Sequence, residues 1–426
     1  MRHVKGLQVS RPLKGLRSSH SKSLDTSVQS AIRILILGLF IGLACWSGIV
    51  GTGISNPILN SSLNSPALSK SNSVSQISTH PKVVFFGSST TVGLWASRGD
   101  RRWSTLLSRY LGWQEINESL SGSTLSKAPR DGKSLPPAAV QRWRDAIVPR
   151  HPDLVLMLYG ANDAYWKLPL GDTVNPKPAT FRGDLETMLT GMTKVFPPDR
   201  LVVLTPQPNQ ATLDRRSAYD LALQEGSKKV GAYFINAGNK AFAIEELPNY
   251  SADGLHLNNL GHAALASYIA GKLVDMGIAT PPPIAQGGNK LLEATEALSG
   301  GFLRIDGDRP LSFGEIHTIS ARWVTSGRAR FAVMRPDGRG GYEVVYRTPI
   351  FDVTSGVMET KVPRWWVLDG DRLAVWTDSS CLGSQSNDGN KAYHLAIKLQ
   401  GDVTLPDVMP NTASFDSHKL AVWIDA

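Results

Sequence analysis

The sequence predicts an α/β fold, a doubly wound parallel sheet in an α/β/α arrangement, followed by an antiparallel β-sandwich. Between residues 82 and 279, short apolar runs alternate with amphipathic segments, a pattern typical of a parallel sheet covered by helices on both faces. The run "TPPPIAQGG" after Ala279 interrupts this alternation. From residue 290 to 426, short alternating runs are separated by Gly, Asp, Asn and Pro clusters without a helical pattern, which predicts the sandwich.

The first 81 residues precede this alternation and divide into three parts. Residues 1–33 carry seven Lys and Arg side chains and one Asp, and we interpret them as a basic cytoplasmic leader. Residues 34–53 contain no charged side chain and are expected to be a membrane anchor or signal segment. Residues 54–81 are rich in Ser, Asn and Pro and are expected to be a flexible linker. No clear small-residue cleavage site follows the apolar run, which favours an uncleaved anchor over a cleaved signal.

This arrangement predicts an extracytoplasmic protein, anchored by one N-terminal segment or secreted, in the bacterial periplasm or at the cell surface. The formal net charge is +9, but most of the excess lies in the leader, so the composition gives no support for a nucleic-acid partner. The chain has two cysteines, far apart in the sequence, and a disulfide scaffold is therefore not expected.

Five apolar runs predict the strands of the parallel sheet, and five amphipathic segments predict its helices. The strands are expected at residues 83–86, 114–119, 154–159, 201–206 and 232–237, of which 114–119 gives the weakest signal. The helices are expected around residues 103–111, 138–148, 180–195, 212–230 and 260–276. Sheets of this kind place their sites at the carboxyl ends of the strands.

Three polar segments fall where such a site is expected. The turn "GSSTTVG" (87–93) follows the first strand, "GAND" (160–163) follows "LVLMLY", and "SADGLHLNNLGHAAL" (251–265) precedes the last helix. Acyl transfer requires a hydroxyl nucleophile, a base, a carboxylate that orients the base, and donors for the oxyanion. The segments supply serine hydroxyls, His256 with Asp253, and the Asn162 amide. Each residue alone would more often have a structural role, so the hypothesis rests on their combination.

These segments resemble the motifs of the SGNH hydrolase family, also called GDSL esterases and lipases. The first family block, G-D-S-x-T-x-G, matches "GSSTTVG" at Gly87, Ser89, Thr91 and Gly93. The second block contributes a glycine, matched by Gly122 in "NESLSGSTL". The third block is complete at residues 160–163 and the fourth, D-x-x-H, at residues 253–256. The resemblance covers about residues 82–277.

The resemblance implies a flavodoxin-like SGNH fold and a catalytic triad of Ser89, His256 and Asp253. It also implies an oxyanion hole formed by the Ser89 N–H, the Gly122 N–H and the Asn162 side chain. One departure is Ser88, which replaces the usual Asp; no triad member is lost, but Ser88 becomes a rival nucleophile. Asp163 is expected to order a loop, and His262 is expected to be structural.

In the C-terminal domain, Trp residues at alternating strand positions are either core residues or platforms for sugar rings. Trp365 and Trp366 are the predicted substrate-binding residues if the domain binds carbohydrate. The sequence contains no clustered metal-ligand motif and no phosphate-binding loop, so neither a metal nor a cofactor is expected.

We therefore predict a serine esterase that acts on short-chain esters, foremost acetyl esters of a surface or secreted polysaccharide. A polysaccharide O-acetyltransferase would use the same triad and would need a separate membrane partner to deliver the acyl donor. A non-catalytic glycan-binding accessory protein of a polysaccharide synthesis or export complex is the alternative from another class. A lipase is a further alternative, but no long apolar lid is evident in the sequence.

Overall fold

The computed structural model describes residues 80–129, 136–238, 240–241, 243–251, 253–386, 394–398, 414–416 and 418–424. The predicted leader and apolar segment, and the predicted linker up to residue 79, lie outside these residues. Among the helices that the structure does describe, none has the length and apolar character needed to cross a bilayer.

Five parallel strands form one sheet with the order β2-β1-β3-β4-β5. The strands are β1 (Lys82–Gly87), β2 (Gln114–Asn117), β3 (Leu154–Leu158), β4 (Leu201–Leu204) and β5 (Tyr233–Ile235). The three central strands are almost entirely apolar and buried, as expected for a parallel sheet covered on both faces. Chain order and spatial order differ at β1, so the connections after β1 and β3 leave in opposite directions.

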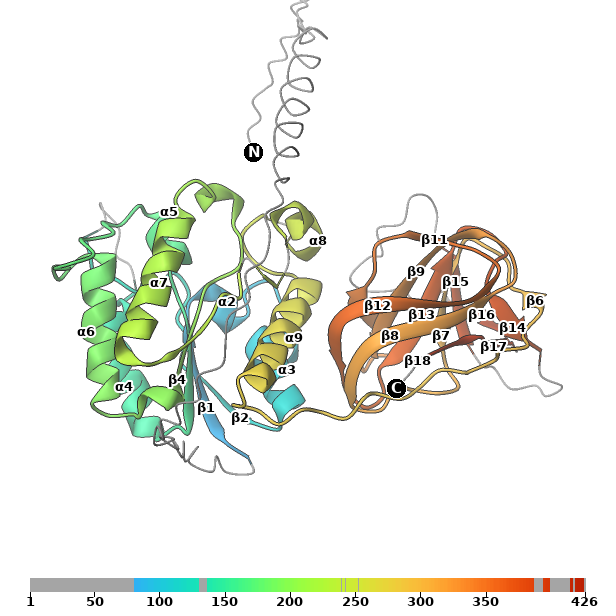
Figure 1. Cartoon of the computed structure of the whole chain (residues 1–426), viewed down its shortest axis with the longest axis horizontal. Helices are drawn as coiled ribbons and strands as arrows, with labels where there is room; N and C mark the ends of the chain where they lie inside the picture. Colours follow the sequence, from blue (N-terminus) through green and yellow to red (C-terminus); the bar gives the residue numbers. More distant parts are fainter. Residues whose placement is uncertain are drawn as a thin grey trace, which may run out of the picture. The chain divides into compact units, whose positions relative to one another are not determined.

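Helices cover both faces of this sheet (Figure 1). On one face, α3 (Trp103–Leu111) and α9 (Asn259–Asp275) pack against alternate strand residues such as Val83 and Phe85. On the other face, α4 (Ala139–Ile147), α6 (Phe181–Thr193) and α7 (Arg216–Val230) pack against the intervening residues. Three short helices, α2 (Ser89–Val92), α5 (Ala161–Tyr165) and α8 (Leu247–Tyr250), lie in connections between these elements.

The C-terminal domain consists of antiparallel strands in the part that the structure describes. A seven-stranded sheet has the order β10-β9-β13-β7-β15-β16 with β11 beside β9, and two three-stranded sheets have the orders β12-β8-β18 and β17-β14-β6. The strands are β6 (Glu296–Ala297), β7 (Phe302–Asp306), β8 (Gly314–Trp323), β9 (Gly327–Pro336), β10 (Tyr342–Arg347), β11 (Phe351–Val353), β12 (Gly356–Val367), β13 (Arg372–Thr377), β14 (Gly383–Gln385), β15 (His394–Lys398), β16 (Ser414–Asp416), β17 (Lys419–Leu420) and β18 (Val422–Ile424). The predicted fold class is therefore confirmed for both domains.

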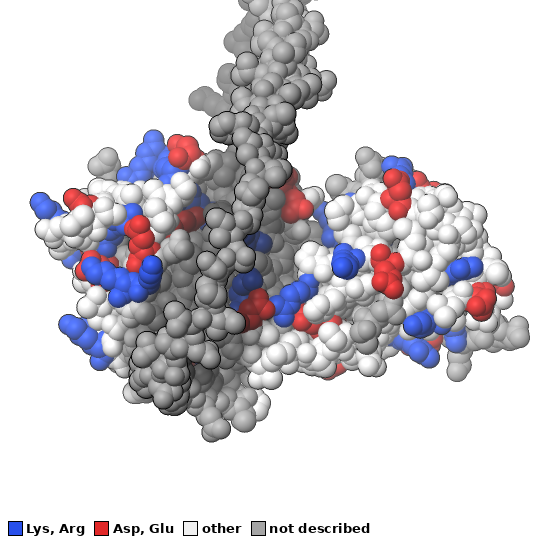
Figure 2. Space-filling model, in the orientation of Figure 1, with Lys and Arg blue, Asp and Glu red and all other residues white. Residues whose placement is uncertain are grey.

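Buried side chains of the α/β domain and of the β domain pack against each other. Helix α9 contacts β10 and β12, and one apolar cluster includes residues of the parallel sheet and of the β domain. On the face drawn in Figure 2, the Lys and Arg side chains of the described residues are interspersed with Asp and Glu. Such mixing does not form the one-signed stripe typical of a nucleic-acid surface.

Candidate active site

The candidate site lies at the carboxyl end of the parallel sheet. Ser89 is the first residue of α2, directly after β1. Asn162 lies in α5, after β3. Asp253 and His256 lie between α8 and α9. The structure thus brings to one sheet edge the residues that the sequence predicts from three separate segments.

The turn from β1 into α2 selects between the two adjacent serines. The Ser88 carbonyl accepts hydrogen bonds from the N–H groups of Thr91 (3.0 Å) and Val92 (2.9 Å), which start the helix. The Ser88 side chain is buried, whereas Ser89 is partly exposed. The Ser89 Oγ lies 3.1 Å from His256 Nε2. This geometry favours Ser89 over Ser88 as the nucleophile.

Asp253 fixes the orientation of His256. Its Oδ2 lies 2.7 Å from His256 Nδ1, and its Oδ1 accepts the N–H groups of Leu255 (2.9 Å) and His256 (2.7 Å). Partial burial opposes ionisation, but the hydrogen bonds from His256 and Leu255 outweigh it and lower the pKa of Asp253 to about 2. An ionised carboxylate only accepts, so Nδ1 carries the proton and Nε2 is left to accept the Ser89 hydroxyl.

The predicted oxyanion residues are Asn162, in α5, and Gly122, in the loop after β2, and hydrogen bonds join these two segments. The Asn162 amide donates to the Ser123 carbonyl at 2.8 Å. Asp163 accepts the N–H groups of Leu125 and Ser126, both at 2.9 Å, so it orders this loop as expected. Gly122 has a φ of +76°, a conformation that favours glycine. The participation of Gly122 and Asn162 in an oxyanion hole stays a prediction.

Gln207 is a site residue that the sequence does not single out. Its buried side-chain amide donates to Thr90 Oγ1 (2.8 Å) and to the Leu255 carbonyl (2.8 Å). It therefore connects the helix that begins with Ser89 to the loop that carries His256. The available signal was its place directly after the fourth apolar run, at the same sheet edge.

His262 has a structural environment. It is fully buried, and its Nδ1 accepts the Trp103 N–H at 3.3 Å. Burial lowers the pKa of His262 to about 4, so the ring is neutral at physiological pH. In the part of the chain that the structure describes, no group of three His, Cys, Asp or Glu side chains is placed to hold a metal ion.

The two tryptophans predicted to bind substrate lie on β12, the strand of the β domain that contacts α9. Trp366 is fully buried, and its ring packs 5.8 Å from that of Tyr110. This corrects the prediction for Trp366, because a ring without an exposed face offers no platform to a sugar. Trp365 stacks on Tyr346 at 5.3 Å and lines a cavity of about 360 Å³ together with Tyr268. Its role in substrate binding stays a prediction.

Comparisons with known protein families and solved structures find similarity over less than half of the chain. Residues 85–264 match the family model described as the GDSL-like lipase/acylhydrolase family. Among solved structures, the chain is similar to an aryl esterase of M. smegmatis, with 17% identity and a TM-score of 0.37, over 46% of this chain and 99% of that chain. It is also similar to Est24, a carbohydrate acetylesterase of Sinorhizobium meliloti, with 18% identity and a TM-score of 0.37 over the same shares.

A lipase/acylhydrolase of Enterococcus faecalis is similar at 21% identity and a TM-score of 0.35, over 46% of this chain and 96% of that chain. No curated protein sequence matches the chain. The family match confirms, for residues 85–264, the resemblance found in the sequence motifs, and it supports an ester hydrolase.

Proposed function

We propose that this GDSL-type ester hydrolase is an extracytoplasmic serine esterase that removes short acyl groups, foremost acetyl, from a surface or secreted polysaccharide. The observation that carries the catalytic part is the continuous chain of contacts from Ser89 Oγ to His256 Nε2 (3.1 Å) and from His256 Nδ1 to Asp253 Oδ2 (2.7 Å). Such a chain activates a serine hydroxyl that is otherwise a weak nucleophile.

In the proposed mechanism, the Ser89 Oγ attacks the ester carbonyl while His256 Nε2 takes the hydroxyl proton. The oxyanion receives hydrogen bonds from the N–H groups of Ser89 and Gly122 and from the Asn162 amide. His256 then returns the proton to the leaving alcohol, and an acyl-Ser89 ester remains. Water attacks this ester with His256 as the base, and the carboxylic acid leaves as Ser89 is regenerated.

The location and the substrate class rest on the sequence. The basic residues 1–33 followed by the apolar residues 34–53 support a catalytic domain on the far side of a membrane. The absence of a long apolar lid segment in the sequence favours short acyl chains over lipids. Acylated carbohydrate is the proposed substrate, and a polysaccharide synthesis or export complex is the proposed setting.

The test compares p-nitrophenyl acetate hydrolysis by the full chain, Ser89→Ala and the matched control Ser88→Ala. We expect Ser89→Ala to lower kcat by at least about a hundredfold, because the hydroxyl that forms the acyl-enzyme is lost. Ser88→Ala should retain most of the activity, since the Ser88 side chain is buried and the hydroxyl that lies 3.1 Å from His256 Nε2 is that of Ser89. Loss of activity in Ser88→Ala alone would reverse the assignment of the nucleophile.

Two further measurements separate the alternatives. A serine-reactive phosphonate should label Ser89 in an esterase or an acyltransferase, and should label nothing in a glycan-binding scaffold. If the phosphonate labels Ser89 but the unlabelled chain turns over p-nitrophenyl acetate no faster than the uncatalysed reaction in water, this would indicate a sugar acceptor and hence a transferase. Preference for p-nitrophenyl octanoate over the acetate would indicate a lipase.

A further inference from the structure

The segment that follows Ser89 makes hydrogen bonds to the helix that carries Ser89 and to the helix that begins shortly after His256. This nucleophile segment, residues 93–102, connects α2 to α3 and contains a single 3-10 turn (Gly99–Arg101). It begins with the N–H groups of Gly93 (3.1 Å) and Leu94 (3.0 Å), which donate to the Ser89 carbonyl. Further on, Ser97 and Asn259 exchange two hydrogen bonds of 2.9 Å. Since Asn259 begins α9, shortly after His256, the segment contacts the elements of both nucleophile and base.

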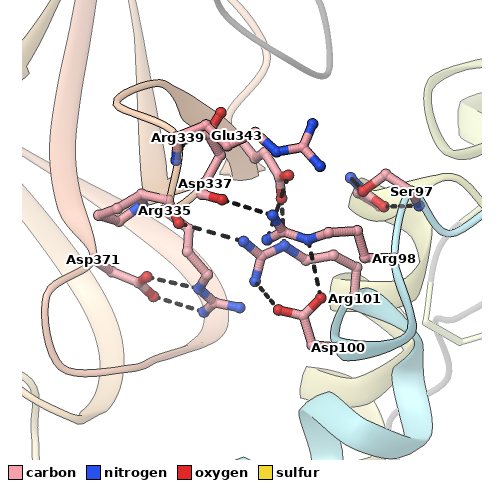
Figure 3. A network of polar contacts seen from close by, with 11 residues as sticks. Ser97, Arg98, Asp100, Arg101, Arg335, Asp337, Arg339, Glu343 and Asp371 are labelled. Carbon is pink, nitrogen blue, oxygen red and sulfur yellow. Dashed lines mark hydrogen bonds and ion pairs between the residues drawn. The ribbon is translucent and has the colours of Figure 1, made fainter.

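On its other side, the nucleophile segment is held by the β9–β10 hairpin of the β domain (Figure 3). The Arg101 Nε donates to Glu343 Oε2, and the Arg98 Nη2 lies 3.7 Å from Glu343 Oε1. The Arg98 Nη1 donates to the Asp337 carbonyl at 2.6 Å. Two of the three arginines of the segment, Arg98 and Arg101, therefore contact one hairpin of the second domain, and both bind Glu343.

This contact is buried and charged. The side chains of Arg101 and Glu343 are each 6% exposed, whereas Asp100, which also pairs with Arg101 at 3.3 Å, is 45% exposed. Burial and the nearby positive charges of Arg335 and Arg101 lower the pKa of Arg109, on α3. Several arginines therefore lie close together at this contact. Arg335 is balanced by Asp371 through two bonds of 2.7 Å. Glu343 is the buried carboxylate that faces Arg101, and without it a buried cation would lack its main partner.

We propose that Glu343 is a positioning residue for Ser89, and thus that the β domain sets the catalytic geometry of the α/β domain. Glu343 holds Arg98 and Arg101, these hold the nucleophile segment, and the segment holds the Ser89 carbonyl and Asn259. The inference rests on the proposed function, because it concerns the alignment of Ser89 with His256. A displacement of about 1 Å at a reacting group can lower a rate by about a hundredfold, so a weakened contact should be visible in kcat.

The experiment measures p-nitrophenyl acetate hydrolysis and phosphonate labelling with the full chain, Glu343→Gln, Arg98→Gln and the control Arg364→Gln. Arg364 also joins the domains, through Glu315 on its own side and Asp275 (2.8 Å) on α9, but it does not touch the nucleophile segment. We expect Glu343→Gln to lower kcat and the labelling rate by about tenfold or more, with KM changed by less than about twofold. Arg364→Gln should lower thermal stability while kcat per folded molecule stays within about twofold.

Hydrogen exchange of residues 93–102 provides a second readout, and it should be faster in Glu343→Gln than in Arg364→Gln. Arg98→Gln should show a smaller loss of kcat, and it carries the test if Glu343→Gln does not fold, because Arg98 is 33% exposed. Unchanged kcat in both Glu343→Gln and Arg98→Gln overturns the proposal. An equal loss in Arg364→Gln also overturns it, because any weakened domain contact would then suffice. A wild-type chain that neither hydrolyses the ester nor is labelled contradicts the proposed function itself, before any variant is compared.

Discussion

At the scale of single residues, Asp253 holds His256 through both of its carboxylate oxygens. One oxygen contacts His256 Nδ1, and the other accepts two backbone N–H groups of the same loop. The carboxylate cannot turn without breaking the backbone bonds, so the ring orientation is built into the loop. The site therefore does not depend on an additional acidic residue beside Ser89, where this chain has Ser88.

The first residue-scale prediction concerns Asp253→Asn. The amide keeps the size of the carboxylate but no longer fixes the tautomer of His256, and we expect kcat to fall by about 10³–10⁴-fold. Wild-type and variant kcat/KM are measured with p-nitrophenyl acetate from about pH 4 to 9. Since the pKa of Asp253 is about 2, its carboxylate is ionised throughout this range. Asp253 should therefore take up no proton on the acidic limb of the wild type, and a limb with a two-proton slope would contradict an Asp253 that stays ionised.

At the scale of elements, the sharp turn from β1 into α2 depends on a residue without a side chain. A Cβ at Gly87 would lie 2.7 Å from Thr91 Cβ and 3.0 Å from the Leu158 carbonyl oxygen. Neither can move easily, because Thr91 belongs to α2 and Leu158 ends β3. The close approach of α2 to the sheet, which places Ser89 at the strand end, thus requires glycine.

Gly87→Ala is expected to push α2 away from the sheet. The overlap should destabilise the protein by about 1–3 kcal/mol and lower kcat by more than the loss of folded protein accounts for. The matched control is Gly99→Ala, since a Cβ at Gly99 meets no atom within 4 Å. Urea unfolding and kcat are measured for both variants. Equal kcat in Gly87→Ala and Gly99→Ala would show that the position of Ser89 does not depend on this turn.

The sequence predicts the elements of the α/β domain well, because each is encoded locally by a strong apolar period. The central strands are continuous apolar runs, and the long helices have one apolar face. The three short helices were not predicted, since four or five residues are too few to show a period. Strand β12 has only a weak signal in the sequence, because Glu359 and Lys361 in its first part are exposed and Pro363 interrupts it.

The candidate site could be predicted only where its residues form compact motifs. Ser89 and the pair Asp253 and His256 occur in short patterns at strand ends, so the sequence indicates them. Gln207 acts through contacts with two distant segments, and Glu343 is 242 residues from Arg101; neither has a local pattern. Trp366 was assigned wrongly because an alternating strand position looks the same whether it faces solvent or another domain.

At the scale of the whole molecule, the described residues belong to one compact unit, and a buried hydroxyl lies where the α/β domain and the β domain meet. The Tyr346 hydroxyl, on β10, lies 3.0 Å from the hydroxyl of Tyr110 and 3.0 Å from that of Ser267. It also donates to the Trp366 carbonyl at 2.9 Å. Because these groups come from α3, α9, β10 and β12, we expect the domains to unfold together.

Tyr346→Phe tests this expectation. The substitution removes the shared hydroxyl and leaves buried polar partners, which should cost about 1–3 kcal/mol. Calorimetry should show one transition for residues of both domains, shifted to lower temperature as a whole. The control is Tyr342→Phe on the same strand, where the shift should be smaller because that tyrosine is less buried. Two separate transitions, of which only one moves, would contradict a common unfolding unit.

Because Glu343 is synthesised after the proposed triad, the contact between the domains can form only late in synthesis. Synthesis proceeds from the N-terminus, so the segment after Ser89 leaves the ribosome long before Glu343 on β10. A nascent chain that has completed His256 already contains the whole proposed triad, but it does not yet contain the hairpin that holds Arg98 and Arg101. Under the positioning role proposed for Glu343, the enzyme matures only when its β domain has folded, and a chain released before that would be a poor esterase in the compartment where it is made.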